Sequence, residues 1–148
     1  MLEANHLALL GCGVFFMTGL ITGLWKYRGM ITSADGQASA YVDICHRAAL
    51  MYAFACLVLA EFARLSDWSA AVNLVAVALP IVFFAAAVGS YAAHGILQDT
   101  DNQLRRPHRI GKRHVHGRVV SAFIYALAAG EIGGFATLLT GSLHKLTA

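Results

Sequence analysis

The chain has 148 residues, of which 58% are hydrophobic, 13% are charged and 14 are glycines. Soluble domains carry about 25% charged residues, so too few polar side chains remain here to cover a surface in contact with water. The composition therefore excludes a soluble monomer, and the length favours a single membrane domain over residues 1–148.

The net charge is +3, but five of the eleven Lys and Arg residues lie between Arg105 and Arg113, between two apolar blocks. Such a run is typical of a membrane-protein loop and argues against a nucleic-acid partner.

Four apolar stretches have close to the ~20 residues that a helix needs to cross a bilayer. Backbone polar groups cannot stay unpaired in lipid, so these spans are predicted to be helices rather than strands. The sequence therefore predicts an all-α bundle of four transmembrane helices in a lipid bilayer. The predicted spans are residues 7–25, 44–63, 72–96 and 119–140. No Lys or Arg precedes Leu7, so the first span is expected to be a helix rather than a cleaved signal peptide.

Small residues and one proline shape the predicted spans. Gly19 and Gly23 in the first span have the GxxxG spacing that lets helices pack closely. Gly130 and Gly134 repeat this spacing in the fourth span, and Pro80 is expected to kink the third. The segments 26–43 and 97–118 are rich in Gly, Asp, Asn, Gln and Ser, so irregular loops are expected there.

The basic residues predict the orientation of the chain. Eight of the eleven lie in the segments 26–43 and 97–118. By the positive-inside bias, these two loops face the cytoplasm and both termini face outward. The predicted location is the cell inner membrane, as a multi-pass protein.

The cysteines show no CxxC spacing, and an odd number of them in apolar segments argues against a disulfide framework (Cys12, Cys45 and Cys56).

Titratable side chains inside lipid are costly and usually face the interior of a bundle. His46 lies two residues inside the second span, whereas Tyr91 and His94 lie five and two residues before the end of the third. Both places are on the predicted cytoplasmic side, so the three side chains are expected at one level, about 3–8 Å deep at 1.5 Å per residue. Tyr91 and His94 share a helix face because they are three residues apart. A simpler interpretation, that these residues belong to the headgroup boundary, stays open at this point.

Two acidic residues also fall inside the predicted spans. Glu61 is near the outer end of the second span and is expected to reach the interface. Glu131 is near the middle of the fourth span, where a neutral carboxyl group hydrogen-bonded to Tyr125 or to a serine is expected.

The sequence contains no GxSxG, HExxH, P-loop or GxGxxG motif, so the common hydrolase, metalloprotease and nucleotide-binding templates do not apply. An imidazole within a four-helix membrane bundle instead favours ligation of haem iron. Here that imidazole is His46. Cys45 is a possible thiolate ligand, but neighbouring residues on a helix point about 100° apart, so only one of the two can face the iron.

Three segments carry a family resemblance. The first is the motif G-x-G-x-F-F-x-x-G-L-x-T-G-L at residues 11–24. The second is His46, which is followed by the small residues Ala48, Ala49 and Ala53. The third is the segment Val88-Gly89-Ser90-Tyr91-Ala92. Together with the order and spacing of the four spans, these segments resemble the hydroxylaminobenzene mutases and styrene oxide isomerases, a small family of four-span membrane proteins. The likeness extends over most of the chain.

The resemblance implies a cofactor, an assembly and a reaction. It implies haem b with His46 as the axial ligand of the iron, in a homo-oligomer (a trimer in the isomerases) with the haem near the subunit boundaries. Tyr91 is implied as the hydroxyl group that orients the bound oxygen. The implied activity is a redox-neutral rearrangement of a small hydrophobic aromatic substrate, with ferric iron as a Lewis acid. The substrate is either an epoxide that becomes an aldehyde or hydroxylaminobenzene that becomes aminophenol.

Two positions depart from that family. Both relatives have an asparagine six residues after the histidine, where this chain has Tyr52, whose hydroxyl group is the candidate catalytic donor in its place. His94 is the second departure and favours an alternative in which His46 and His94 both bind the haem. Six-coordinate iron has no open position for a substrate, so that protein would be a b-type cytochrome or membrane-anchor subunit for electron transfer. A third alternative is a non-catalytic membrane protein whose polar residues only lock the helices together.

Overall fold

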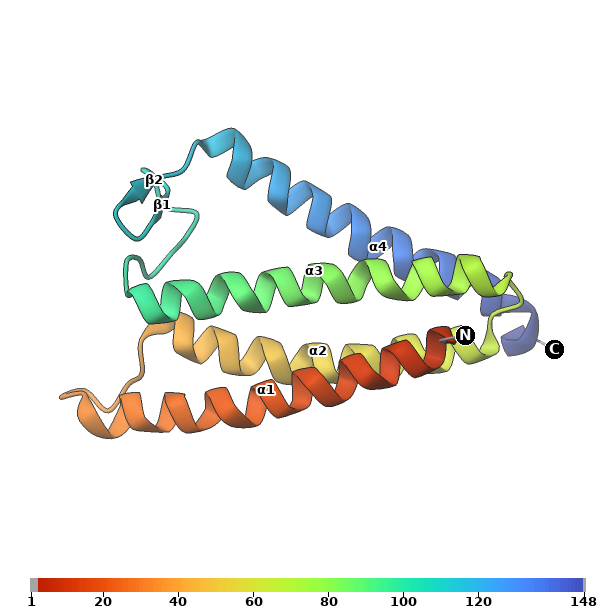
Figure 1. The fold of residues 1–148 in the computed structure, drawn as a ribbon, viewed down its shortest axis with the longest axis horizontal. Coiled ribbons are helices and arrows are strands. Elements are labelled where there is room, and N and C mark those ends of the chain that lie inside the picture. The colour runs from red at the N-terminus through yellow and green to blue at the C-terminus, as the bar shows by residue number, and fades with distance from the viewer. Residues whose placement is uncertain (1–2, 148) are drawn as a thin grey trace.

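The computed structural model of the chain describes residues 3–147 and consists of four long helices and one short β-hairpin (Figure 1). In chain order the helices are α1 (Ala4–Thr32), α2 (Ala40–Leu65), α3 (Ala70–Leu97) and α4 (Gly117–Thr147). The hairpin of β1 (Arg109–Ile110) and β2 (Arg113–His114) lies between α3 and α4 in the chain. All four helices are long and apolar enough to cross a bilayer, so the prediction of an all-α bundle with four membrane-spanning helices is confirmed.

The helices are longer, and the first connection is shorter, than the sequence suggested. Each predicted span lies inside one helix. The expectation of an irregular loop over residues 26–43 is wrong, because α1 continues to Thr32 and α2 begins at Ala40. A helix that continues past the hydrocarbon layer keeps its backbone hydrogen bonds within itself, which favours extension. The Lys26 ammonium group lies 2.6 Å from the Asp43 carboxylate, so the two helices are also joined near this connection.

The segment between α3 and α4 contains a hairpin where only irregular structure was expected. Ile110 pairs with Arg113, which leaves Gly111 and Lys112 as a two-residue turn. Gly111 has a φ of +59°, and two-residue hairpin turns need a positive φ at this first position. Glycine adopts that conformation without steric cost, so Gly111 is the residue that permits the turn.

Both GxxxG pairs face neighbouring helices of the same chain. Gly19 packs on Leu50, and Gly23 packs on the ring of His46, so the first pair lets α1 approach α2 closely. The second pair faces α3 in the same way. The close approach that the spacing predicted is therefore made within one subunit.

The contact of Gly134 on α3 involves a backbone atom as well as a side chain. A Cβ added to Gly134 would lie 2.6 Å from both the Ala76 carbonyl oxygen and Pro80 Cγ. Pro80 lies inside α3, which continues unbroken to Leu97. The missing side chain of Gly134 therefore provides the space that the proline ring fills.

Aromatic and small side chains form the core between α1, α2 and α3. The Tyr52 ring stacks on Phe84 with centroids 4.1 Å apart, and it meets the edge of Phe15 at 6.1 Å. Such offset and edge contacts stabilise a core beyond the area that they bury. Alanines and cysteines fill the space around these rings (Ala8, Ala49, Ala53, Cys45 and Cys56).

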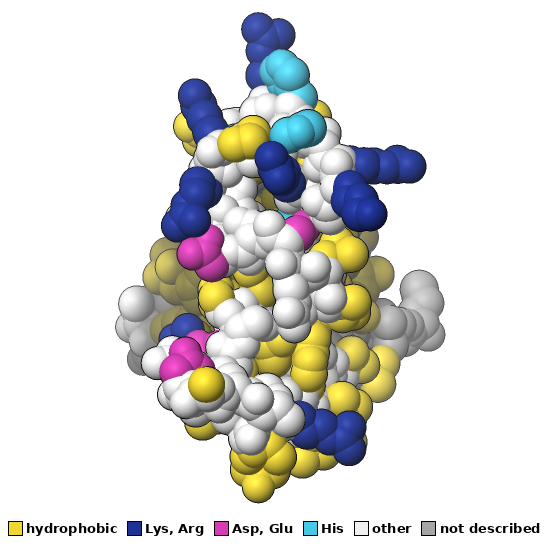
Figure 2. All heavy atoms as spheres, turned by 90° about the vertical axis from the view of Figure 1, so that its left-hand side faces the viewer, with side chains coloured by type: hydrophobic (Ala, Val, Ile, Leu, Met, Phe, Trp, Pro, Cys, Tyr) yellow, Lys and Arg dark blue, Asp and Glu magenta, His cyan; other side chains and the backbone are white. Residues whose placement is uncertain are grey.

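Helix α4 packs on the bundle over its C-terminal half only. Its buried residues are Gly130, Gly134, Leu138, Gly141 and Ser142. Its N-terminal half diverges from α3 toward the hairpin, and both chain termini lie at the opposite end of the molecule (Figure 1). Lys and Arg side chains surround the hairpin end (Figure 2). The two basic segments that the sequence placed on one side of the membrane are thus at one end of the bundle.

Candidate functional site

His46 lies on the face of α2 that contacts α1. Its Nδ1 is 2.8 Å from the carbonyl oxygen of Gly19, which can only accept, so Nδ1 carries a proton and donates it. The ring packs on Gly23, where an added Cβ would lie 3.0 Å from His46 Cε1. The side chain is partly exposed, and no residue within 3–147 forms a hydrogen bond with Nε2. The ring is therefore oriented while the lone pair of Nε2 stays free, as in histidines that ligate a metal.

A group of charges from α2 and α1 lies beside His46. Asp43 binds Lys26 of α1 at 2.6 Å and Arg47 at 2.8 Å. Two cations share one carboxylate, so this group has a net charge of +1 close to the imidazole. A net positive charge favours an anionic group, such as a haem propionate, over a free metal cation.

His94 lies near the C-terminal end of α3 and is 4% exposed. Its Nδ1 is 2.7 Å from one carboxylate oxygen of Asp99, and the other oxygen accepts the backbone N–H of Gly111 in the hairpin turn. Burial alone would raise the pKa of Asp99, but the hydrogen bonds from His94 and Gly111 outweigh it and lower the pKa below 3.8, its ordinary value. Asp99 is therefore ionised at neutral pH and can only accept, so Nδ1 of His94 is the donor.

Tyr41 of α2 contacts both of the α3 residues that the sequence singled out. Its ring stacks on Tyr91 with centroids 6.1 Å apart and lies tilted on His94 at 4.9 Å. Its hydroxyl oxygen accepts the backbone N–H of Gln103 at 2.5 Å. Tyr91 and His94 thus belong to one cluster that ties α2, α3 and the hairpin segment together.

His46 lies apart from this cluster. It follows Tyr41 by five residues, which places the two side chains about 140° apart around α2. Tyr41 faces α3, whereas His46 faces α1. A single chain therefore does not place His46 opposite Tyr91 or His94 across a shared space. The alternative with both histidines on one iron has no support in the contacts within one subunit.

Tyr52 and Cys45 also face α3 and not the His46 side of α2. Cys45 is buried, and its Sγ lies 3.8 Å from the carbonyl oxygen of Val88. Tyr52 belongs to the aromatic core through its stacking on Phe84. Cys45 is therefore not positioned to replace His46 as a ligand, and the hydroxyl group of Tyr52 is not beside the imidazole.

The hydrogen bond expected for Glu131 is wrong. Its Oε1 is buried and has no hydrogen-bond partner among residues 3–147. Tyr125 is 76% exposed, and six residues along a helix place its side chain about 120° around the axis from that of Glu131. Glu61 lies near the end of α2 and forms a two-point ion pair with Arg64, at 2.6 and 3.0 Å.

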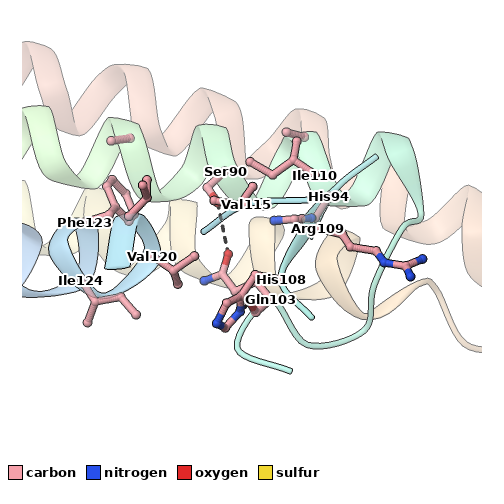
Figure 3. A pocket seen from close by; sticks show the side chains of 13 residues that line it. Ser90, His94, Gln103, His108, Arg109, Ile110, Val115, Val120, Phe123 and Ile124 are labelled. Carbon is pink, nitrogen blue, oxygen red and sulfur yellow. Dashed lines mark hydrogen bonds between the residues drawn. The ribbon is translucent and has the colours of Figure 1, made fainter. Parts of the chain in front are cut away.

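A cavity of about 320 Å³ lies where α4 diverges from α3 (Figure 3). Its polar lining comes from two residues of α3 and three of the segment that follows (Ser90, His94, Gln103, His108 and Arg109). The Ser90 hydroxyl group donates to Gln103 Oε1 at 3.2 Å.

The sequence pointed to His94 but not to Asp99, Gln103 or this cavity. The available signals were an aspartate five residues after His94 and the turn glycine that the aspartate binds.

Comparison of the chain with known protein families, with curated proteins and with solved structures finds no match. The class that the fold defines is a multi-pass membrane protein with four spanning helices. Within residues 3–147 no group of three or more His, Cys, Asp and Glu side chains could hold a metal ion. A haem iron needs only one or two axial ligands from the chain, and the free Nε2 of His46 fits that role.

Proposed function

We propose that this protein is a haem-b-dependent membrane isomerase that rearranges a small hydrophobic aromatic substrate without net oxidation or reduction. The observation that carries the proposal is the imidazole of His46, whose Nδ1 proton is held by the Gly19 carbonyl while Nε2 is free. The resemblance of residues 11–24, His46 and residues 88–92 to the styrene oxide isomerases and hydroxylaminobenzene mutases supplies the reaction class. The substrate is an aromatic epoxide or hydroxylaminobenzene.

The chain's own residues would hold the cofactor in the following way. His46 binds iron through Nε2, and its hydrogen bond to Gly19 keeps the ring oriented and makes the imidazole a better electron donor. Lys26 and Arg47, with Asp43 between them, provide the positive charge for the propionates. When bound, ferric haem supplies a Lewis acid that polarises a substrate oxygen.

The position of His46 favours an oligomer. The imidazole is partly exposed, and the outer faces of α1 and α2 near it carry exposed apolar side chains (Leu20, Leu24, Met51 and Phe54). An apolar cofactor held there needs protein contacts on its outer side as well, and a second copy of the chain would provide them. The proposal therefore includes a homo-oligomer with haem near the subunit boundary, in the inner membrane with the basic hairpin end in the cytoplasm.

Tyr91 and Tyr52 have a more limited part in this proposal than His46. Tyr52 of α2 packs on Phe84 of α3, and Tyr91 of α3 packs on Tyr41 of α2, so both rings lie on the face where α2 and α3 meet. Their proposed role as hydroxyl donors requires a substrate that reaches this face. Replacing each tyrosine with phenylalanine separates that role from packing, because the ring stays and only the hydroxyl group is lost.

The first test is the absorption spectrum of the purified protein, expressed with an adequate haem supply. We expect a Soret band that is lost in His46→Ala and kept in His94→Ala and in His116→Ala, a control at an exposed histidine. Absence of the band from the wild-type protein would overturn the haem proposal. Loss of the band in both His46→Ala and His94→Ala, with His116→Ala unchanged, would favour the cytochrome instead.

A finer test uses the glycine beneath the imidazole. A Cβ at position 23 would crowd His46 Cε1 at 3.0 Å, whereas nothing lies within 4 Å of a Cβ at position 13. Gly23→Ala should therefore shift the ferric spectrum or weaken haem retention, and Gly13→Ala should leave both unchanged. Equal behaviour of the two variants would contradict His46 as the ligand.

The reaction is tested by incubating the haem-loaded protein with styrene oxide and, separately, with hydroxylaminobenzene. Phenylacetaldehyde or aminophenol should form and should disappear with His46→Ala. A protein that binds haem through His46 but converts neither compound would keep the cofactor assignment and overturn the named reactions.

A further inference from the structure

The cavity between α3, the hairpin segment and α4 has the size and lining of a small-molecule site. Its volume of about 320 Å³ is at the lower end of the range of ligand pockets, which begins near ~300 Å³. Its walls are mostly apolar, with the largest share from one face of α4 (Val119, Val120, Phe123 and Ile124). A molecule of about the size of one aromatic ring with a substituent fits this space.

The polar end of the cavity presents a hydrogen-bond acceptor without a partner in the described part of the chain. His94 is 4% exposed and lines the cavity, and its Nδ1 is committed to Asp99. In the neutral imidazole Nε2 is then an acceptor, and no residue within 3–147 bonds to it. Tyr41 packs on the ring, and Asp99 is itself held by Gly111, so the imidazole is fixed from two sides. Nε2 of His94 is therefore an oriented acceptor in the lining of the cavity, available to a donor group of a ligand.

A hydrogen-bond donor lies at the same end. The side-chain oxygen of Gln103 accepts from Ser90, and the amide N–H₂ of Gln103 has no hydrogen-bond partner in the described part of the chain. The backbone of Gln103 is held by the Tyr41 hydroxyl group and by His108, whose Nδ1 lies 3.1 Å from the Gln103 carbonyl oxygen. Figure 3 shows Ser90, His94 and Gln103 together, with Phe123 and Ile124 farther along the cavity.

An acceptor and a donor in the lining of one cavity match a hydroxyl group, which both donates and accepts. We propose that this cavity is a binding site for a small apolar alcohol or phenol. The hydroxyl group of the ligand donates to Nε2 of His94 and accepts from the amide of Gln103, and its apolar body lies against α4. This site is separate from His46, which faces α1 on the other side of α2. The test of this site is therefore independent of the test of the haem proposal.

The test is ¹⁹F NMR titration of the purified full-length protein in detergent micelles, with 4-fluorophenol as the probe. Fluorobenzene has the same ring without the hydroxyl group and reports simple partition into apolar space. We expect saturable binding of 4-fluorophenol, displaced by unlabelled phenol and at least about tenfold tighter than binding of fluorobenzene. The same binding is expected in His46→Ala, which separates this outcome from that of the haem experiments.

Neighbouring alanines of α3 provide a matched pair of variants. Both Ala85 and Ala86 are exposed, but only Ala86 lines the cavity. Ala86→Phe should fill the cavity and weaken binding of 4-fluorophenol by at least about tenfold, and Ala85→Phe should not. Val120→Trp fills the cavity from α4 and should act like Ala86→Phe, which guards against a folding defect in either variant.

Three outcomes would overturn the inference. One is equal binding of the two probes, which indicates an apolar crevice filled by lipid chains. Another is equal binding by Ala85→Phe and Ala86→Phe, which places the phenol elsewhere. The third is the absence of saturable binding, as expected if a second copy of the chain occupies the space.

Discussion

The two ends of the α3–α4 pair are built in opposite ways. At the end that carries the chain termini, α4 is bound to the rest of the bundle through side chains and backbone. The Ser142 hydroxyl group donates to the Phe62 carbonyl at 2.9 Å, and Trp68 Nε1 donates to the Thr137 carbonyl at 2.9 Å. At the hairpin end the two helices separate, and no residue of the segment 117–129 is buried.

This difference follows from where α4 carries glycine. Gly130, Gly134 and Gly141 lie in its C-terminal half, and a Cβ at any of them would come within 2.6 Å of a neighbouring atom. The face of the N-terminal half carries larger side chains such as Val120 and Phe123, which hold α4 away from α3. One end of the pair is therefore specialised for stability, and the other leaves a cavity next to a buried histidine.

The largest expected effect concerns the closed end. Gly134→Val should destabilise the protein by about 3 kcal/mol or more, because its side chain would overlap a backbone oxygen and the Pro80 ring, neither of which can move easily. Gly133→Val is the matched control, since nothing lies within 4 Å of a Cβ there. Thermal unfolding in detergent measures both. Similar melting temperatures for the two variants would show that α4 does not pack on α3 through Gly134.

The next effect concerns the open end. Asp99→Asn removes one of two acceptor oxygens in a buried pair and should cost about 1–3 kcal/mol locally. Hydrogen exchange of the hairpin, followed by mass spectrometry, should become faster, while exchange in the C-terminal half of α4 should not change. Faster exchange in both places would mean that the two ends unfold as one unit.

The same carboxylate predicts a pH dependence. Folding lowers the pKa of Asp99 below 3.8, so its ionised form stabilises the hairpin above that pH. This contribution is lost as the pH falls through the lower pKa of the folded state. Hairpin protection, corrected for the intrinsic exchange rate, should therefore decrease below pH 3.8 in the wild-type protein. In Asp99→Asn, the decrease in hairpin protection with falling pH should be smaller. A pH profile of this variant equal to that of the wild-type protein would contradict the role of Asp99.

A smaller effect distinguishes two serines of α4. Ser142→Ala removes the hydrogen bond to Phe62 in a fully buried site and should cost about 1 kcal/mol. Ser121 is exposed on the open half and has no hydrogen bond among the described residues, so Ser121→Ala should have little effect. Thermal unfolding compares the two. Equal small shifts would show that the closed end depends on packing alone.

The smallest effect is expected for the surface ion pairs at the two ends. Lys145 binds Asp67 at 2.9 Å at the closed end, and Arg105 binds Asp101 at 2.9 Å at the open end. All four side chains are at least 45% exposed, so water and salt screen both pairs. Lys145→Ala and Arg105→Ala should leave the melting temperature unchanged within error. A clear loss in either variant would reveal a contact with a neighbouring subunit.

Sequence reasoning was most successful for the helices and least successful for the partners of individual polar residues. The hydropathy of each span predicted a helix, and the GxxxG spacing predicted faces of close approach. The shared level of Tyr91 and His94 follows from helix geometry, whereas the contact of Tyr41 with both of them was not predicted. Asp99 was missed because its partnership with His94 depends on a turn that brings a polar loop back onto α3.

The sequence by itself determined that this chain is a bundle of four membrane-spanning helices with both basic loops at one end. Hydropathy and charge act locally, summed over about 20 residues, so no knowledge of neighbouring helices is needed. Only the tertiary structure decided that His46 faces α1 while Tyr41, Tyr52 and Cys45 face α3, and that α4 opens a cavity beside His94. Which side of a helix meets which partner depends on the packing of side chains from distant segments, and that packing is set by the whole bundle at once.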